Sequence, residues 1–359
     1  MRKVKVLVVD DSALMRKIIS DMINSEKNME VVGIARNGQD FLKKLEDIKP
    51  NVVTLDVEMP IMNGIEALKE LKRRNINIPV IVLSSISKEC SELTMECLEN
   101  GAFDFIAKPS GSISLDIDKV ENELISKINL AYEKCQDGCS FEEIRSISKE
   151  LSIELNEENK TIPKKAFTNK VAALVIGTST GGPKALHEVV SNLPDDLGIP
   201  VFVVQHMPAT FTKAFAERLN TKCKITVVEA YDGQVVLNNV VYIAPGGFHM
   251  EVGKDKKIHL NKEPTIWGVR PAVDKLFKSA AVVYKEKLLS VVLTGMGKDG
   301  AEGTIEVKKN GGITISEDKS TSIIYGMPKA AFETGMVDMV LRLDKVASEI
   351  VKLVKRNGR

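Results

Sequence analysis

The sequence has little of what marks a membrane protein, a disulfide-rich secreted protein or a strongly basic nucleic-acid-binding protein. Only 5% of its 359 residues are aromatic, and five scattered cysteines are typical of reduced thiols in a cytoplasmic protein. Lys and Arg number 50 against 49 Asp and Glu, so no global basic charge indicates a nucleic-acid partner. No apolar run approaches the roughly 18 residues of a membrane helix, so we expect no membrane insertion.

What the chain does contain is apolar material for two cores, since 43% of its residues are hydrophobic. In the N-terminal part, short β-branched runs alternate with amphipathic helical stretches, a pattern that predicts βαβ units and a parallel sheet. We expect one five-stranded, doubly wound α/β domain over residues 1–130. Its predicted strands are Val4–Val9, Val31–Ile34, Val52–Leu55, Val80–Leu83 and Phe103–Ala107.

A second α/β domain is expected over residues 169–359, mostly parallel, with antiparallel excursions between Ile225 and Leu260. Between the two domains, residues 131–168 are rich in Glu, Lys, Ser and Asn and are interpreted as a charged linker. Cys135 and Cys139 lie in this linker, but without a second pair of ligands we interpret them as ordinary thiols rather than a metal site.

Polar residues stand just past the predicted strand ends of the first domain, namely Asp10, Asp11, Asp56, Ser84 and Lys108. The carboxyl ends of parallel strands share one edge of a sheet, so these side chains are expected to meet there. Three clustered carboxylates repel one another unless a hard cation such as Mg²⁺ joins them. A carboxylate is also a competent nucleophile toward phosphorus, which predicts an aspartyl-phosphate held by the hydroxyl and the lysine.

The ordered set Val-Val-Asp10-Asp11-Ser, Leu-Asp56-Val-Glu-Met-Pro, Leu-Ser84-Ser and Ala-Lys108-Pro resembles the receiver domain of response regulators, a flavodoxin-like fold. The resemblance implies that a histidine kinase phosphorylates Asp56. It also implies that the acidic residues and the backbone carbonyl of Glu58 coordinate Mg²⁺, and that Phe105 is the aromatic switch residue beside Ser84 and Lys108.

A glycine-rich turn follows the first predicted strand of the second domain. Gly177-Thr-Ser179-Thr-Gly181 matches G-x-S-x-G, a strand-to-helix turn that exposes a serine hydroxyl. Such a turn can also bind phosphate at the helix N-terminus, although the spacing lacks both G-x-G-x-x-G and the P-loop pattern. The motif alone leaves a hydrolase, a phosphate site and a plain turn open.

A serine nucleophile needs a base and an acid to orient that base. Of the four histidines, His206 directly follows the strand Val201–Gln205 and is expected at the same sheet edge as Ser179. Asp299 lies in another glycine-rich turn, where it either orients the imidazole or caps the helix that begins near Ala301. The order Ser, His, Asp differs from that of α/β-hydrolases, which predicts a convergent site on another fold.

The same stretches, with Gln205-His-Met-Pro, Arg270-Pro-Ala-Val-Asp and Thr294-Gly-Met-Gly-Lys-Asp-Gly, resemble the catalytic domain of chemotaxis protein-glutamate methylesterases. The resemblance implies Ser179 as nucleophile, His206 as base and Asp299 as acid. It further implies an oxyanion-hole N–H from the turn around Met296, with Thr180 and His249 adjacent to the site.

The resemblance implies hydrolysis of glutamyl methyl esters, and deamidation of glutamines, on the cytoplasmic helices of chemoreceptors. The hydrolytic reaction is expected to need no cofactor. The receiver is expected to cover the hydrolytic site until Asp56 is phosphorylated. Two rival functions are a DNA-binding output, for which no basic recognition helix is present, and a nucleotide-binding enzyme that uses Gly177–Gly182 and Gly295–Gly300 as phosphate loops.

Overall fold

The computed structural model describes residues 3–108, 117–136 and 170–355. The chain divides into two compact units, Met1–Asn156 and Glu157–Arg359. Most of the predicted linker, with Cys139, lies outside the described residues, so the domain limits 1–130, 131–168 and 169–359 stay predictions. None of the described helices combines the length and the apolar character that a membrane crossing requires.

The first unit contains a five-stranded parallel sheet, which confirms the predicted fold. In spatial order its strands are β2 (Met29–Ala35), β1 (Val4–Val9), β3 (Val52–Asp56), β4 (Val80–Ser84) and β5 (Asp104–Ala107). Its helices are α1 (Ala13–Ser25), α2 (Gly38–Ile48), α3 (Gly64–Arg73), α4 (Lys88–Glu99) and α5 (Ile117–Gln136).

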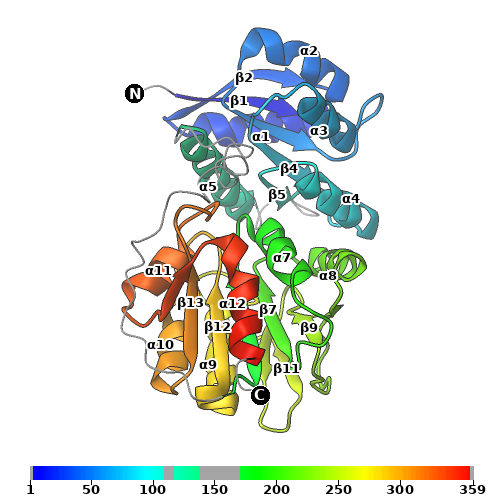
Figure 1. Cartoon of the computed structure of the whole chain (residues 1–359). Helices are drawn as coiled ribbons and strands as arrows, with labels where there is room; N and C mark the ends of the chain where they lie inside the picture. The colour runs from blue at the N-terminus through cyan, green and yellow to red at the C-terminus, as the bar shows by residue number, and fades with distance from the viewer. Residues whose placement is uncertain (1–2, 109–116, 137–169, 356–359) are drawn as a thin grey trace, which may run out of the picture. The chain divides into compact units, whose positions relative to one another are not determined.

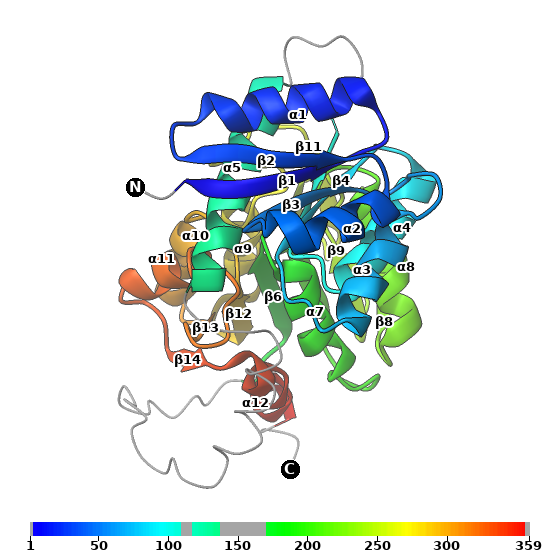
Figure 2. The same cartoon turned by 90° about the horizontal axis from the view of Figure 1, so that it is seen from above.

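Local sequence signals explain where several of these helices begin. Ser12, Asn37, Asn63 and Ser87 each accept a hydrogen bond from a backbone N–H of the first turn that follows. At α3 the cap is reciprocal, because Glu66 also accepts a bond from the N–H of Asn63. Helices α1 and α5 contact each other, as do α2 and α3, and Figure 2 shows α1 and α2 on opposite sides of the strands. The sheet is therefore covered on both faces.

The second unit contains a seven-stranded sheet in which every described pairing is parallel. In spatial order its strands are β14 (Met339–Leu341), β13 (Ile313–Glu317), β12 (Leu288–Val292), β6 (Ala173–Thr178), β7 (Val201–Gln205), β9 (Val240–Ile243) and β8 (Thr226–Glu229). The predicted antiparallel excursion is a separate hairpin of β10 (His249–Val252) and β11 (Ile258–Asn261). The fold class of this domain is thereby confirmed.

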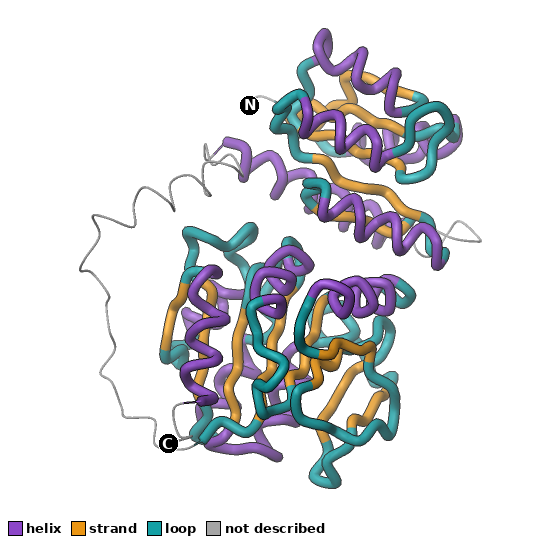
Figure 3. The backbone as a smooth tube through the Cα atoms, turned by 45° about the vertical axis from the view of Figure 1, so that its right-hand side comes forward, coloured by secondary structure: helices purple, strands orange, loops and turns teal. Residues whose placement is uncertain are grey.

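Helices flank the strands in both units, as the purple and orange tubes of Figure 3 show. Those of the second unit are α7 (Gly182–Ser191), α8 (Phe211–Lys222), α9 (Val273–Tyr284), α10 (Ala301–Lys309), α11 (Met327–Glu333) and α12 (Leu343–Lys355), with a 3₁₀ turn at Lys285–Lys287. Helix α7 contacts α8 and α12, whereas α9 and α11 both contact α10, and Figure 1 shows α7 and α12 in front of the strands. Phe202, Tyr242 and Phe277 are fully buried in the core between sheet and helices.

Candidate functional sites

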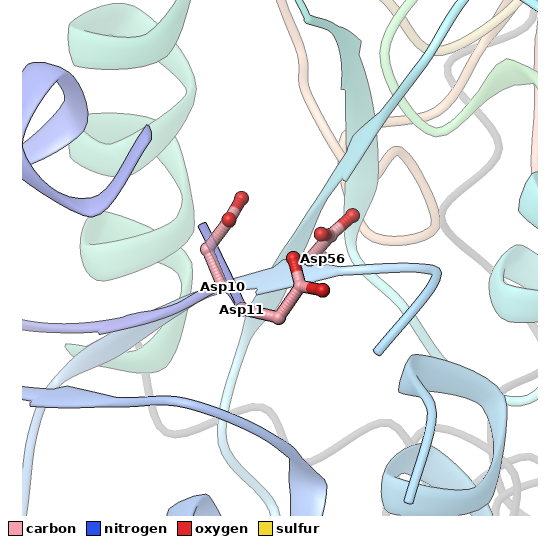
Figure 4. Close-up of side chains that lie close together, drawn as sticks. All are labelled: Asp10, Asp11 and Asp56. Carbon is pink, nitrogen blue, oxygen red and sulfur yellow. The ribbon is translucent and has the colours of Figure 1, made fainter. Parts of the chain in front are cut away.

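The acidic residues predicted from the first domain lie together at the carboxyl edge of its sheet. Asp10 and Asp11 follow β1 and Asp56 ends β3, and one ligand oxygen from each lies within 4.8 Å of the others. Figure 4 shows the three side chains projecting from the ends of these two neighbouring strands. Asp10 and Asp56 are buried, whereas Asp11 is exposed, so a small ligand can approach this edge from solvent.

A single lysine offsets this concentration of negative charge. The Lys108 ammonium lies 2.8 Å from a carboxylate oxygen of Asp10 and 2.7 Å from one of Asp56. Burial, together with the charges of Asp10 and Asp11, raises the pKa of Asp56 to about 6 despite that lysine. Three converging carboxylates with an excess of negative charge fit a hard divalent cation such as Mg²⁺, which prefers oxygen ligands.

The other residues predicted for this site lie close to it. Ser84 ends β4 and accepts a hydrogen bond from the Thr94 hydroxyl at 2.7 Å. Phe105 is 4% exposed, and the Lys127 ammonium lies 5.6 Å from the centre of its ring. The Glu58 carboxylate accepts a bond from the Cys90 thiol at 2.8 Å, and the metal-ligand role of the Glu58 backbone carbonyl stays a prediction.

In the second domain, three neighbouring strands carry the predicted catalytic residues. Strand β6 pairs with β12 on one side and with β7 on the other, so the strand order reverses at β6. Ser179 follows β6, His206 follows β7, and Asp299 lies in the turn after β12. Ligands of open α/β sheets bind at the carboxyl ends of strands at such a switch point. The fold thus places all three residues at one location.

The serine turn is held against the turn that follows β12. The Ser179 N–H donates to the Thr294 carbonyl at 3.1 Å, and the Thr178 hydroxyl donates to the same oxygen at 2.7 Å. Gly295 has to be glycine, because a Cβ there would come within 2.9 Å of the Ser179 Cβ. Among the described residues no hydrogen-bond partner is found for the Ser179 hydroxyl or for the N–H of Thr180, which is buried.

The predicted base, His206, and the predicted acid, Asp299, form a direct pair. Asp299 Oδ2 lies 2.8 Å from His206 Nε2, so Nδ1 is the ring nitrogen that does not face this carboxylate. The same carboxylate accepts the N–H groups of Val273 at 2.6 Å and Asp274 at 2.8 Å, in the first turn of α9. Burial favours the neutral acid, but the bond and charge of His206 and these two N–H groups more than compensate and hold the pKa of Asp299 below its ordinary value.

One alternative role of Asp299 is wrong. Helix α10 begins after Gly300 without a cap from a neighbouring side chain in sequence, so Asp299 does not cap the helix that follows it. It caps α9 instead, which begins 26 residues earlier in the chain. The cap of α10 comes from Asp274, whose Oδ1 accepts the N–H groups of Gly300 and Gly303 at 3.0 and 2.7 Å.

The remaining predicted residues divide into two groups. Thr180 is buried beside Ser179 and its carbonyl accepts the Thr294 hydroxyl at 3.0 Å, while Met296 is 45% exposed in the turn before Asp299. His249 is fully buried at the start of β10, where its Nε2 bonds the Pro264 carbonyl at 3.0 Å. No described hydrogen bond links His249 to the Ser179, His206 and Asp299 group.

Sequence reasoning missed Gln205, which ties two of the predicted residues together. Its side-chain amide donates to the backbone carbonyls of Ser179 at 2.9 Å and His206 at 3.0 Å. The residue is 2% exposed, and its place directly before His206 was the available signal. A buried amide at the last position of an apolar strand needs polar partners, and here they are the backbone carbonyls that follow the ends of β6 and β7.

Comparisons with known proteins agree with this arrangement. Residues 174–350 match the CheB methylesterase family and residues 6–117 match the response regulator receiver domain. A protein-glutamate methylesterase/protein-glutamine glutaminase from Clostridium acetobutylicum is 54% identical over 99% of both chains. A protein of the same name from Pyrococcus horikoshii is 46% identical over 99% of this chain and 94% of its own.

A solved structure also resembles the second unit. The crystal structure of the Thermotoga maritima CheB methylesterase catalytic domain is 46% identical, with a TM-score of 0.50. The match covers 52% of this chain and all of that one. The likeness therefore extends over the sheet that carries Ser179, His206 and Asp299.

Proposed function

Because this chain belongs to the CheB methylesterase family, we propose that it hydrolyses glutamyl methyl esters, and deamidates glutamines, on chemoreceptors through Ser179, His206 and Asp299. The observation that carries this proposal is the 2.8 Å bond between His206 and Asp299 beside the serine turn, at the strand switch point. The same groups would act on an ester or an amide, because both pass through a tetrahedral intermediate.

In the proposed reaction the Ser179 hydroxyl attacks the ester carbonyl while His206 Nδ1 takes its proton. The anionic oxygen of the intermediate would be stabilised by backbone N–H groups. The candidates are the turn around Met296 and the Thr180 N–H, which has no hydrogen-bond partner within the described part of the chain. The protonated imidazole then gives its proton to the leaving methoxide. Methanol departs, and water releases free glutamate from the acyl-serine by the same steps.

Asp299 supports this cycle electrostatically. Its depressed pKa keeps the carboxylate ionised, so it stabilises the imidazolium that forms during attack. The helix α9 N–H groups fix the carboxylate in place without taking its hydrogen bond to His206. A hydrogen bond from the Ser179 hydroxyl to His206 is expected to form when substrate binds, because catalytic hydrogen bonds often close only in the substrate complex.

We propose further that Asp56 is the phosphorylation site and that a chemotaxis histidine kinase supplies the phosphoryl group. Asp10, Asp11, Asp56 and the carbonyl of Glu58 would hold Mg²⁺, which neutralises the incoming phosphoryl oxygens. Lys108 and the Ser84 hydroxyl would then hold the new charge, and that change would relieve occlusion of the hydrolytic site. A cytoplasmic location stays part of this proposal.

The nucleotide-binding alternative has less support. A phosphate loop offers free N–H groups at a helix N-terminus, yet the Gly300 and Gly303 N–H groups already bind the Asp274 carboxylate. These two N–H groups are therefore not free for a phosphate, and the membership of the CheB methylesterase family favours the hydrolase.

The test offers purified methylated receptor to the full chain and measures methanol release. Ser179→Ala should lose about 10⁴-fold in rate or more, because the nucleophile is gone while the fold is kept. Ser348→Ala, an exposed serine on α12, is the matched control and should keep its rate. Activity of Ser179→Ala within tenfold of wild type would contradict the proposed function.

A further inference from the structure

We infer that Asp274 is a positioning residue, which sets the catalytic turn Gly295–Gly300 so that Asp299 meets His206. The inference rests on the proposed function, and it adds a residue that contacts neither Ser179 nor His206 in the described structure. Asp274 lies in the first turn of α9 and is fully buried. Its carboxylate has three donors, and two of them belong to the end of the catalytic turn and the start of α10.

The two helices α9 and α10 lack caps of their own and exchange them. Neither Ala272 nor Gly300, their N-cap residues, provides a capping side chain. Asp299 accepts the first N–H groups of α9, and Asp274 accepts those of α10. Each carboxylate also sits at the positive end of the other's helix dipole. The direction of Asp299 is thus fixed by the position of α9, and Asp274 fixes the turn that carries Asp299.

A third donor connects Asp274 to the surface. The Trp267 indole N–H donates to Asp274 Oδ2 at 2.9 Å, and Trp267 is 47% exposed. The Lys298 ammonium, next to Asp299 in sequence, lies 3.8 Å from the centre of the indole ring. Trp267 therefore holds one side of the Asp274 carboxylate through a hydrogen bond and one side of the catalytic turn through its ring.

Two buried carboxylates so close together need a reason. Burial and the neighbouring Asp299 charge raise the pKa of Asp274, so the arrangement opposes ionisation. One buried carboxylate, Asp299, together with a neutral serine or asparagine as the cap of α10 would cost less free energy than two buried carboxylates. The two oxygens of Asp274 instead accept three donors from two directions, which a single hydroxyl oxygen cannot do. This set of bonds orients the Gly295–Gly300 turn as well as capping α10.

The experiment compares D274N, W267F and the double variant in the full chain. An asparagine amide that turns its oxygen to Gly300 and Gly303 faces the indole N–H with its own NH₂, donor against donor. W267F removes the indole N–H that would face the asparagine NH₂, and it keeps an aromatic ring beside Lys298. The readouts are kcat and KM for methanol release from methylated receptor, the acid limb of kcat against pH, the rate at which phenylmethylsulfonyl fluoride labels Ser179, and thermal unfolding.

We expect D274N to lower kcat about 100-fold with little change in KM, because a misplaced turn costs about that much. Its acid limb should move to lower pH, since a weaker contact with Asp299 stabilises the imidazolium less. W267F should cost less than D274N, and the double variant should recover to about 10-fold below wild type. Recovery in the double variant, which still lacks the charge, assigns the effect to hydrogen bonding.

Wild-type kcat and an unmoved acid limb in D274N, with lowered thermal stability alone, would reduce Asp274 to a helix cap and overturn the inference. If D274N does not fold, kcat and the acid limb of the D274N/W267F double variant are compared with wild type in the same way. Ser179→Ala and Asp299→Ala run in parallel: if these keep activity, the proposed function fails, whereas their inactivity beside a fully active D274N removes only the role of Asp274.

Discussion

A single carboxylate, that of Asp299, bonds both the imidazole of His206 and the first turn of α9. Its position in a glycine-rich turn after a strand indicated a role at the sheet edge. The sequence could not show which helix it caps, because the capped residues are 26 positions away and only packing brings them near. Asp274 was part of a motif that supported the family resemblance, but no local pattern identified its partners Gly300 and Gly303.

Asp56 provides a pH-dependent prediction at the same scale. Its pKa of about 6 in the folded state lies above the roughly 3.9 of an aspartate in the unfolded chain. The native state therefore keeps the Asp56 proton to a higher pH than the unfolded state does. Between about pH 4 and pH 6 the native state binds more protons, and stability must fall as the pH rises. At pH 7 without Mg²⁺, Asp56→Asn should therefore raise the unfolding free energy by about 1 to 2 kcal/mol.

Calorimetry of the full chain, following the transition of the N-terminal unit, measures this difference. Asp47→Asn, an exposed carboxylate on α2, is the control and should change little. Mg²⁺ should stabilise the wild type more than Asp56→Asn, because the cation offsets the crowded charge. An Asp56→Asn variant that is less stable than wild type at pH 7 would contradict the electrostatic account.

At the scale of elements, the sequence pattern predicts the long strands well, because buried parallel strands appear in the sequence as continuous apolar runs. Strands β3 and β4 are buried at every position, which matches the predicted runs at 52–55 and 80–83. The three-residue strand β14 (Met339–Leu341) escaped prediction, since so short a run carries no period. Strands β8 and β9 fell in a region expected to contain antiparallel pairs, yet they pair parallel, because the sheet rather than the local turns sets their direction.

Helix α3 allows a prediction about local signals. Asn63 and Glu66 form a reciprocal cap at its start, so Asn63→Ala should destabilise the N-terminal unit by about 1 kcal/mol. Lys43→Ala, in the exposed middle of α2, is the control and should stay within about 0.5 kcal/mol. Thermal unfolding of the same N-terminal transition gives both values, and equal stabilities would show that the cap contributes nothing.

For the whole molecule, the two units carry two candidate sites, and the proposed function couples them. If the receiver covers the hydrolytic site, deleting residues 1–165 should raise basal methanol release and abolish any response to a small phosphodonor. Full-length Asp56→Asn is the control, with basal activity kept and the response lost. Unchanged basal activity after the deletion would mean that the receiver does not restrict access.

The position of β6 in the middle of the second sheet has a consequence for how the protein is made. Strand β12 lies more than one hundred residues after β6 in the chain, and it still has to insert beside it. Until the ribosome has released that stretch, the nascent polypeptide contains the proposed nucleophile Ser179 and the proposed base His206, but not Asp299, which would orient that base. Hydrolytic activity should therefore appear in one step, late in synthesis of the chain. Proteolytic fragments that end before the Gly295–Gly300 turn should be inactive toward esters.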